Sequence, residues 1–91
     1  MIKELEFART ADGGSEAAFV SQGGATVQIQ RTAMKGVTVL GNIPGMPPCV
    51  VGTYGNPYNK GILIAVDLPV GVTVTIRCAC EVESAKMMTD D

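Results

Sequence analysis

Side chains between Val72 and Val82 alternate between apolar and polar at every step, and no other feature constrains the fold as strongly. The apolar positions are Val72, Val74, Ile76, Cys78, Cys80 and Val82, and the positions between them are Thr73, Thr75, Arg77, Ala79 and Glu81. A period of two is that of a β-strand, because successive side chains of a strand point to opposite faces. An amphipathic helix would instead place apolar groups three and four residues apart. The pattern therefore predicts one long strand over Gly71–Glu83 with a buried face.

Six further segments have the character of strands and are separated mostly by Gly, Pro or Asn. They lie near residues 4–7, 16–21, 25–32, 36–43, 49–53 and 61–68. Residues 61–68 carry apolar groups on both faces, the pattern of a strand covered on both sides, and the turn Pro69–Gly71 predicts a tight hairpin to the next strand. Short strands at such regular spacing are typical of sandwiches and barrels. We expect an all-β fold: an antiparallel β-sandwich of about seven strands, jelly-roll-like.

The length of 91 residues predicts a single domain over residues 1–91. Residues 41–61 hold four of the five prolines and five of the eleven glycines. Because proline removes a backbone donor, we expect much of this segment to be an irregular, extended connection that runs over one end of the sheets. Residues 84–91 are expected to form a short C-terminal tail.

Composition narrows the classes of function. The net charge is −2 and the basic residues occur singly, which disfavours nucleic-acid binding because that needs several phosphate contacts at once. There is no long apolar run for a membrane span, and the start MIKELEF lacks the apolar core of a secretory signal. We therefore expect a protein that is made in the cytoplasm without a signal peptide.

Charged residues make up only 18% of the chain, against about 25% in typical domains. A small domain has much surface, so other residues must cover it. Either the solvent faces of the strands are rich in threonine, or part of the surface is buried in an oligomer or a partner. Composition alone leaves both interpretations open.

The three cysteines do not predict a metal site. Tetrahedral zinc sites use four Cys or His ligands, and this chain has no histidine. Cys78 and Cys80 lie on the aliphatic face of the predicted strand, where we expect them to act as small core residues. A disulfide between them is not expected, because an extended strand holds their Cα atoms about 6.5–7 Å apart. Whether Cys49 pairs with either of them stays open.

The carboxylates and the absence of histidine give no basis for an enzyme. Histidine is the commonest general base, and its absence removes the usual triads. Glu81 and Glu83 share a strand face, as do Glu4 and Glu6, and neighbours on an exposed face are most often solvated charge. We expect a non-enzymatic protein with no cofactor and no metal.

The segment Tyr54–Asn59 is the one candidate binding site. It holds both tyrosines of a chain without tryptophan, in a stretch whose Gly, Asn and Pro residues favour a turn. Tyrosine at a loop tip gives a large contact area at low entropic cost. The candidate binding residues are Tyr54, Asn56, Tyr58 and Asn59. In the alternative interpretation the two rings only close the end of the sandwich.

The stretch AVDLPVGVTVTIRCACEVESAKMM resembles small all-β structural proteins of tailed bacteriophages, of the head-fibre or head-decoration type. The resemblance covers Ile62–Met88 and, more loosely, MIKELEFART at the start. Its motif is a hydrophobic residue followed by Asp-x-Pro-x-Gly and alternating valines. The resemblance implies a non-enzymatic virion component that assembles as a homo-oligomer or on a larger protein assembly such as a capsid or tail. It carries over no binding residue, and the alternative is a small carbohydrate- or surface-binding module that uses the Tyr54–Tyr58 loop.

Overall fold

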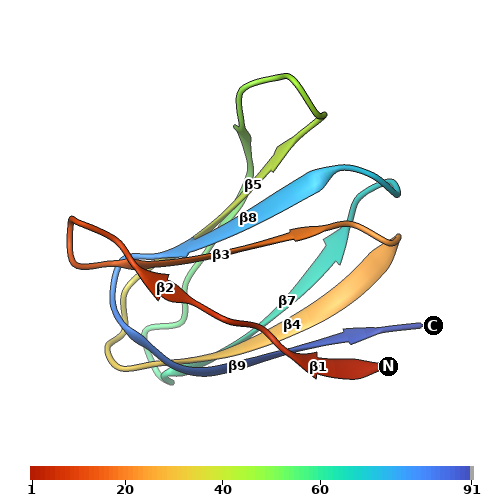
Figure 1. The fold of residues 1–91 in the computed structure, drawn as a ribbon. Coiled ribbons are helices and arrows are strands. Elements are labelled where there is room, and N and C mark those ends of the chain that lie inside the picture. The colour runs from red at the N-terminus through yellow and green to blue at the C-terminus, as the bar shows by residue number, and fades with distance from the viewer. Residues whose placement is uncertain (91) are drawn as a thin grey trace.

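The structure, a computed structural model, describes residues 1–90, which form nine strands and no helix (Figure 1). The strands are β1 (Ile2–Glu4), β2 (Ala8–Arg9), β3 (Ser15–Val20), β4 (Gly24–Arg31), β5 (Val37–Asn42), β6 (Cys49–Tyr54), β7 (Gly61–Asp67), β8 (Thr73–Cys78) and β9 (Val82–Thr89). They make a four-stranded sheet in the order β1-β9-β4-β7 and a five-stranded sheet in the order β2-β3-β8-β5-β6. All neighbouring strands are antiparallel. The predicted all-β, antiparallel class is confirmed. Across residues 1–90 no helix is present that could cross a membrane.

The strands pair in nested fashion from the two ends of the chain toward its middle. β1 pairs with β9, β3 with β8, β4 with β7 and β5 with β6. The outermost pair is closed by two hydrogen bonds: the Met1 amino group donates to the Thr89 carbonyl at 2.7 Å, and the Thr89 amide donates to the Met1 carbonyl at 2.8 Å. The first and last described strands therefore lie side by side.

The two strands beyond the expected seven arise where predicted strands change sheets. The strand predicted near residues 4–7 is wrong in its position. Residues 5–7 connect β1, which ends at Glu4, to β2, which begins at Ala8 in the other sheet, and Leu5 lies buried at this crossing. The predicted strand over Gly71–Glu83 ends at Cys78, bends at Ala79 and Cys80, and resumes in the other sheet as β9. The alternation of apolar and polar side chains continues across the bend, so the sequence pattern does not reveal it.

The expected C-terminal tail at 84–91 is wrong for residues 84–89. These residues complete β9, which lies between β1 and β4 and bonds to both. Their buried members are Ala85 and Met87, which are two apart and face the core. Residues of moderate β-propensity form a strand here because the sheet on either side provides backbone partners. Asp91 lies outside the described residues.

The tight hairpin expected at Pro69–Gly71 is also wrong. β7 belongs to the four-stranded sheet and β8 to the five-stranded sheet, so this turn is a corner between sheets. Gly71 takes a φ of 97°, which favours glycine. The buried Ser21 hydroxyl donates to the Leu68 carbonyl at 2.7 Å and ties the corner to the end of β3.

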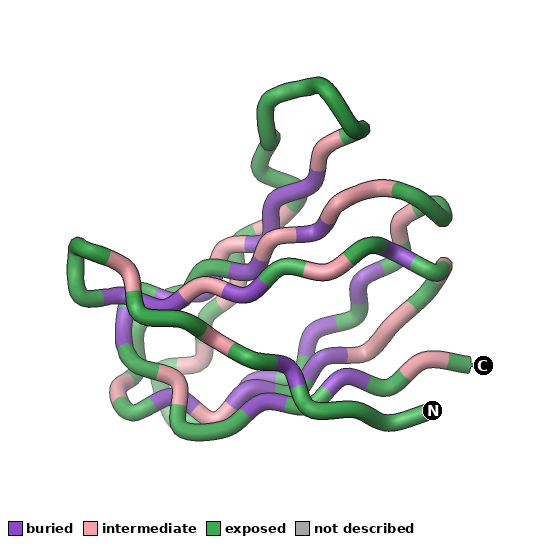
Figure 2. The backbone as a smooth tube through the Cα atoms, viewed as in Figure 1, coloured by how far each residue is buried: buried purple, intermediate pink, exposed green. Residues whose placement is uncertain are grey.

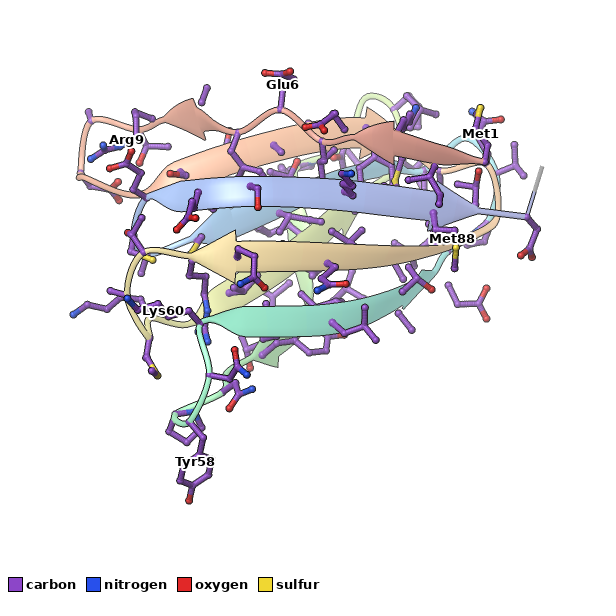
Figure 3. All side chains as sticks on the ribbon, turned by 90° about the horizontal axis from the view of Figure 1, so that it is seen from below. Met1, Glu6, Arg9, Tyr58, Lys60 and Met88 are labelled. Atoms are coloured by element: carbon purple, nitrogen blue, oxygen red, sulfur yellow. The ribbon has the colours of Figure 1, made fainter. Side chains whose placement is uncertain are left out.

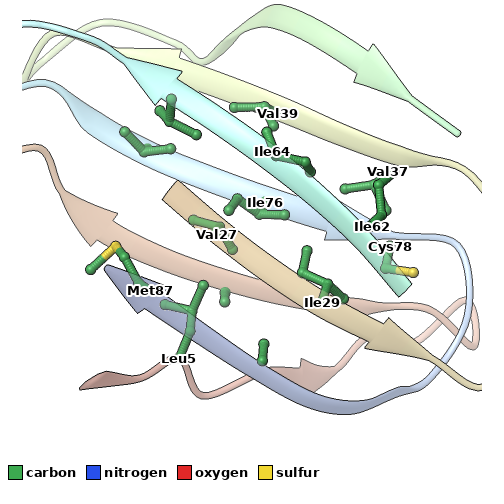
Figure 4. Packing of buried hydrophobic residues seen from close by; sticks show 14 of the residues in the cluster. Leu5, Val27, Ile29, Val37, Val39, Ile62, Ile64, Ile76, Cys78 and Met87 are labelled. Carbon is green, nitrogen blue, oxygen red and sulfur yellow. The ribbon is translucent and has the colours of Figure 1, made fainter. Parts of the chain in front are cut away.

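The core lies between the two sheets (Figure 4). Val27, Ile29 and Ile64 of the four-stranded sheet pack in one cluster with Val74 and Ile76 of the five-stranded sheet, and each is at most 1% exposed. Burying one such side chain stabilises the fold by roughly 1.5–3 kcal/mol. The predicted buried face of residues 72–82 is confirmed at its centre, where Val74, Ile76 and Cys78 are buried.

The outer face of β7 is open, although its apolar residues predict cover on both sides. Leu63 is 68% exposed, whereas its neighbour Ile64 is 1% exposed. β7 is an edge strand with β4 as its one partner in the sheet. Only one face of β7 is therefore buried within a single chain.

Candidate functional site

The loop between β6 and β7 carries the predicted site residues, and the structure separates the two tyrosines. Tyr54, at the end of β6, is half-buried and packs against the core cluster. Its ring lies over Gly52, where a Cβ atom would come within 2.9 Å of the Tyr54 hydroxyl oxygen. Tyr58 is 91% exposed and points away from the body of the molecule (Figure 3). Tyr54 therefore has a packing role, and only Tyr58 is freely available at the surface.

The two predicted asparagines shape the loop with their side chains. The Asn56 Oδ1 accepts a hydrogen bond from the Tyr58 amide at 3.0 Å, and the Asn59 Oδ1 accepts one from the Gly61 amide at 2.7 Å. The Asn56 Nδ2 donates to the Gly61 carbonyl at 3.4 Å. Asparagine stabilises turns in this way by bonding to the backbone two residues ahead. Much of the hydrogen-bonding capacity of these amides is used inside the loop.

Arg31 anchors the same loop from within the protein. Arg31 is 1% exposed, and its guanidinium donates to the carbonyl oxygens of four residues. Nε bonds to Lys60 at 3.1 Å, Nη2 bonds to Asn56 at 3.0 Å and Asn59 at 2.6 Å, and Nη1 bonds to Lys35. No carboxylate among residues 1–90 forms an ion pair with it. A buried charge must be satisfied by hydrogen bonds, and here backbone carbonyls of two loops supply them.

The sequence contains a signal for Arg31 that composition does not reveal. Arg31 follows Val27 and Ile29 at a spacing of two, so the alternation that buries those residues also directs Arg31 inward. Arg31 was counted only as one of the basic residues that occur singly, and its burial was not predicted.

A shallow groove lies beside the loop on the outer face of β4 and β7. Its volume is about 530 Å³, and its lining includes Gln28, Gln30, Tyr54, Asn56 and Asn59. Tyr58 is not among the lining residues. The groove thus brings together three of the four predicted residues and adds two glutamines that the sequence analysis missed. Neutral amides offer donors and acceptors to a polar, uncharged ligand but provide no acid or base for catalysis.

The β5–β6 hairpin projects from the body of the molecule instead of running over the end of the sheets as expected (Figure 1). Its tip is a turn in which the Met46 amide donates to the Ile43 carbonyl at 2.9 Å. Pro44 and Gly45 occupy the central positions, and Gly45 has a φ of 89°, as a type II turn requires. The connection is therefore a projecting arm with a hydrogen-bonded turn at its tip.

The tip of the projecting hairpin is exposed (Figure 2). Four apolar residues of this hairpin, Ile43, Met46, Val50 and Val51, are each between 51% and 67% exposed. The pairing of β5 with β6 shifts register so that Val51 is an extra residue on β6, which explains why adjacent valines are both exposed. We call these four residues the hairpin patch.

Cys49 lies apart from Cys78 and Cys80 and forms no disulfide with either of them. Cys49 is exposed and free at the start of β6, whereas Cys78 and Cys80 are buried together. Within residues 1–90, no three potential metal ligands come together.

Comparisons of the chain with models of protein families, with curated proteins and with solved structures found no match. The residues described above are therefore the basis on which a function is proposed.

Proposed function

We propose that this chain is a non-enzymatic structural or interaction domain with a jelly-roll β-sandwich fold. In this proposal it assembles with itself or on a larger protein assembly, as the resemblance to phage head proteins implies. The nested pairing supports the jelly-roll assignment. If β1 and β2 count as one strand that crosses between sheets, eight strands pair as first with last, second with seventh, third with sixth and fourth with fifth. Jelly rolls of two four-stranded sheets occur in viral capsid and lectin domains.

The hairpin patch is the observation that carries the assembly proposal. Exposed apolar groups scattered singly are ordinary, but a projecting arm that gathers four of them is typical of an interaction site. The patch includes Val50 and Val51 of β6, which is an edge strand of the five-stranded sheet. β6 has the sequence CVVGTY and carries no charged residue of the kind that usually protects edges from pairing. An edge of this kind supports partner binding by strand addition together with apolar contact.

Replacing Val50 with lysine is expected to weaken assembly at least about tenfold, because a charge would be buried in an apolar contact. Gel filtration with light scattering over a range of protein concentrations measures the effect. Val20→Lys is the matched control, since Val20 is a similarly exposed valine on β3, outside the hairpin patch. If the unmodified protein stays monomeric at the highest concentrations, self-assembly is wrong, and docking on a larger particle is the remaining form of the proposal.

The groove favours a second candidate function, a small carbohydrate-binding module. Its four neutral amides and the adjacent Tyr54 suit a neutral ligand that carries many hydroxyl groups. This candidate uses Gln28 and Gln30 in place of the exposed Tyr58.

Glycan binding in the groove predicts that Gln30→Ala lowers affinity by about tenfold, the effect of losing one or two hydrogen bonds. Tyr58→Ala should leave binding in the groove nearly unchanged, and it should leave the melting temperature unchanged because the side chain is exposed. A glycan array followed by titration of any ligand found measures both. If only Tyr58→Ala lowers the affinity for the glycan, the binding site is at the loop tip and not in the groove. A glycan array without any signal would contradict the carbohydrate-binding function.

A further inference from the structure

Two buried thiols meet at the corner where the chain leaves β8 for β9. The Sγ atoms of Cys78 and Cys80 lie 3.4 Å apart, and the Cys80 Sγ lies 3.5 Å from the Ala33 carbonyl oxygen. Cys78 is 3% exposed and Cys80 is 8% exposed. The extended spacing that argues against a disulfide does not apply here, because the chain bends at Ala79 and Cys80. The two sulfurs need to approach by little more than about 1.3 Å to reach a bonding distance.

The surroundings shift the pKa values of the two thiols in opposite directions. Burial opposes ionisation of Cys80, but the hydrogen bond with the Cys78 thiol and contacts with Ala33 and Thr32 outweigh it, so the pKa of Cys80 lies below its ordinary value. Burial raises the pKa of Cys78, and the neighbouring Cys80 sulfur adds to that effect. The thiolate is the reactive form, so Cys80 is the better nucleophile of the pair.

The position of the corner gives a small reagent a route to Cys80. Ala79 and Glu81, on either side of it, are both exposed. The corner residues 79–81 lie between the two strands and outside either sheet ladder. The Ala79 amide donates to the Gly36 carbonyl at 3.1 Å, and the Glu81 carbonyl accepts from the Thr32 amide at 3.0 Å. A local opening that uncovers Cys80 would break these bonds but not the pairing of β8 or β9.

We propose that Cys78 and Cys80 are a reversible dithiol–disulfide pair that exchanges with small-molecule disulfides. The Cys80 thiolate attacks one sulfur of the small disulfide, which forms a mixed disulfide and releases one small thiol. Cys78 then gives up its proton and attacks the Cys80 sulfur, which releases the second small thiol. The two protein thiols are oxidised by two electrons to one disulfide, and the small disulfide is reduced to two thiols.

The bond would fix the corner between the sheets in one arrangement. Because it closes a ring over a single intervening residue, Ala79, it should be strained and correspondingly easy to reduce. A strained disulfide is suited to reversible modification, whereas a structural disulfide is difficult to reduce. The exposed Cys49 takes no part in it.

The test uses the folded Cys49→Ser protein, which keeps only the two corner thiols, incubated with 2-hydroxyethyl disulfide. The proposal predicts that the thiol titre falls from two to none. It also predicts a chain mass lower by two hydrogens, a peptide linked between Cys78 and Cys80, and full reversal by dithiothreitol. The double variant Cys49→Ser/Cys78→Ala should instead hold a stable mixed disulfide at Cys80, because the second thiol is missing.

Three outcomes would overturn the proposal. One is accumulation of mixed disulfides in Cys49→Ser itself, and another is a bond between chains in place of the internal one. The third is a folded protein that keeps both thiols under conditions in which the same chain reacts when it is denatured. Circular dichroism of Cys49→Ser before oxidation establishes that the protein is folded.

Discussion

Replacing Arg31 with methionine is expected to lower the free energy of unfolding by at least about 3 kcal/mol. Methionine fills a similar volume but donates no hydrogen bond, so the carbonyl oxygens of Lys35, Asn56 and Asn59 lose the donor on the side chain. The Lys60 carbonyl keeps only its bond from the Arg31 backbone amide. Each buried polar group left unsatisfied costs about 1–3 kcal/mol. Arg31→Lys should recover only part of the loss, because one ammonium cannot reach donor positions that are spread over a planar fork.

Thermal and urea unfolding measure this effect, which corresponds to a fall in melting temperature of more than about 10 °C for a domain of this size. Arg77→Met is the matched control, because Arg77 is exposed and its partner Glu16 lies at the surface. Exposed ion pairs contribute about 0–1 kcal/mol. Equal stability of the two variants would contradict the role assigned to Arg31 as the internal anchor of the β6–β7 loop.

The second large effect is expected at Ile64, where substitution by alanine should lower the free energy of unfolding by about 2–5 kcal/mol. Ile64 is 1% exposed in the core cluster, and the lost methyl groups leave a cavity that the facing sheet cannot fill. Leu63→Ala removes an aliphatic side chain from the adjacent residue, which points to solvent, and should cost about 0.5 kcal/mol or less. Chemical unfolding of both variants at low protein concentration gives the comparison.

The Leu63 control also reports on assembly. If Leu63→Ala is as damaging as Ile64→Ala in the isolated chain, the outer face of β7 is covered within the monomer and the sheet arrangement is wrong. If Leu63→Ala matters only at high protein concentration, a second molecule covers this face. The two residues thus separate burial within a chain from burial between chains.

Alternation in the sequence correctly predicted the buried face of residues 72–82, but it did not predict which strands are neighbours. Val74 and Ile76 were correctly placed inside because period two survives any choice of partner strand. The corner at Pro69–Gly71 looks the same in sequence whether it joins two strands of one sheet or passes between sheets. The bend at Ala79–Cys80 is hidden for a related reason, since both thiols still face the interior.

The candidate site was predicted in part. The Gly, Asn and Pro content of residues 55–60 correctly indicates a turn, and three of the four predicted residues line one groove. Gln28 and Gln30 come from β4, more than twenty residues earlier, and only the pairing of β4 with β7 brings them beside the loop. The anchoring by Arg31 depends in the same way on contacts distant in sequence.

The hydrogen bonds between Met1 and Thr89 have a practical consequence. Because residues 1 and 89 lie side by side, a short flexible peptide could link β9 to β1, and a circular permutant could begin and end at Pro44–Gly45 on the projecting hairpin. Such a circular permutant should keep both sheets, and the turn that joins β5 to β6 would be open. Likewise, the domain could be spliced into a surface loop of a host protein without forcing the host backbone apart.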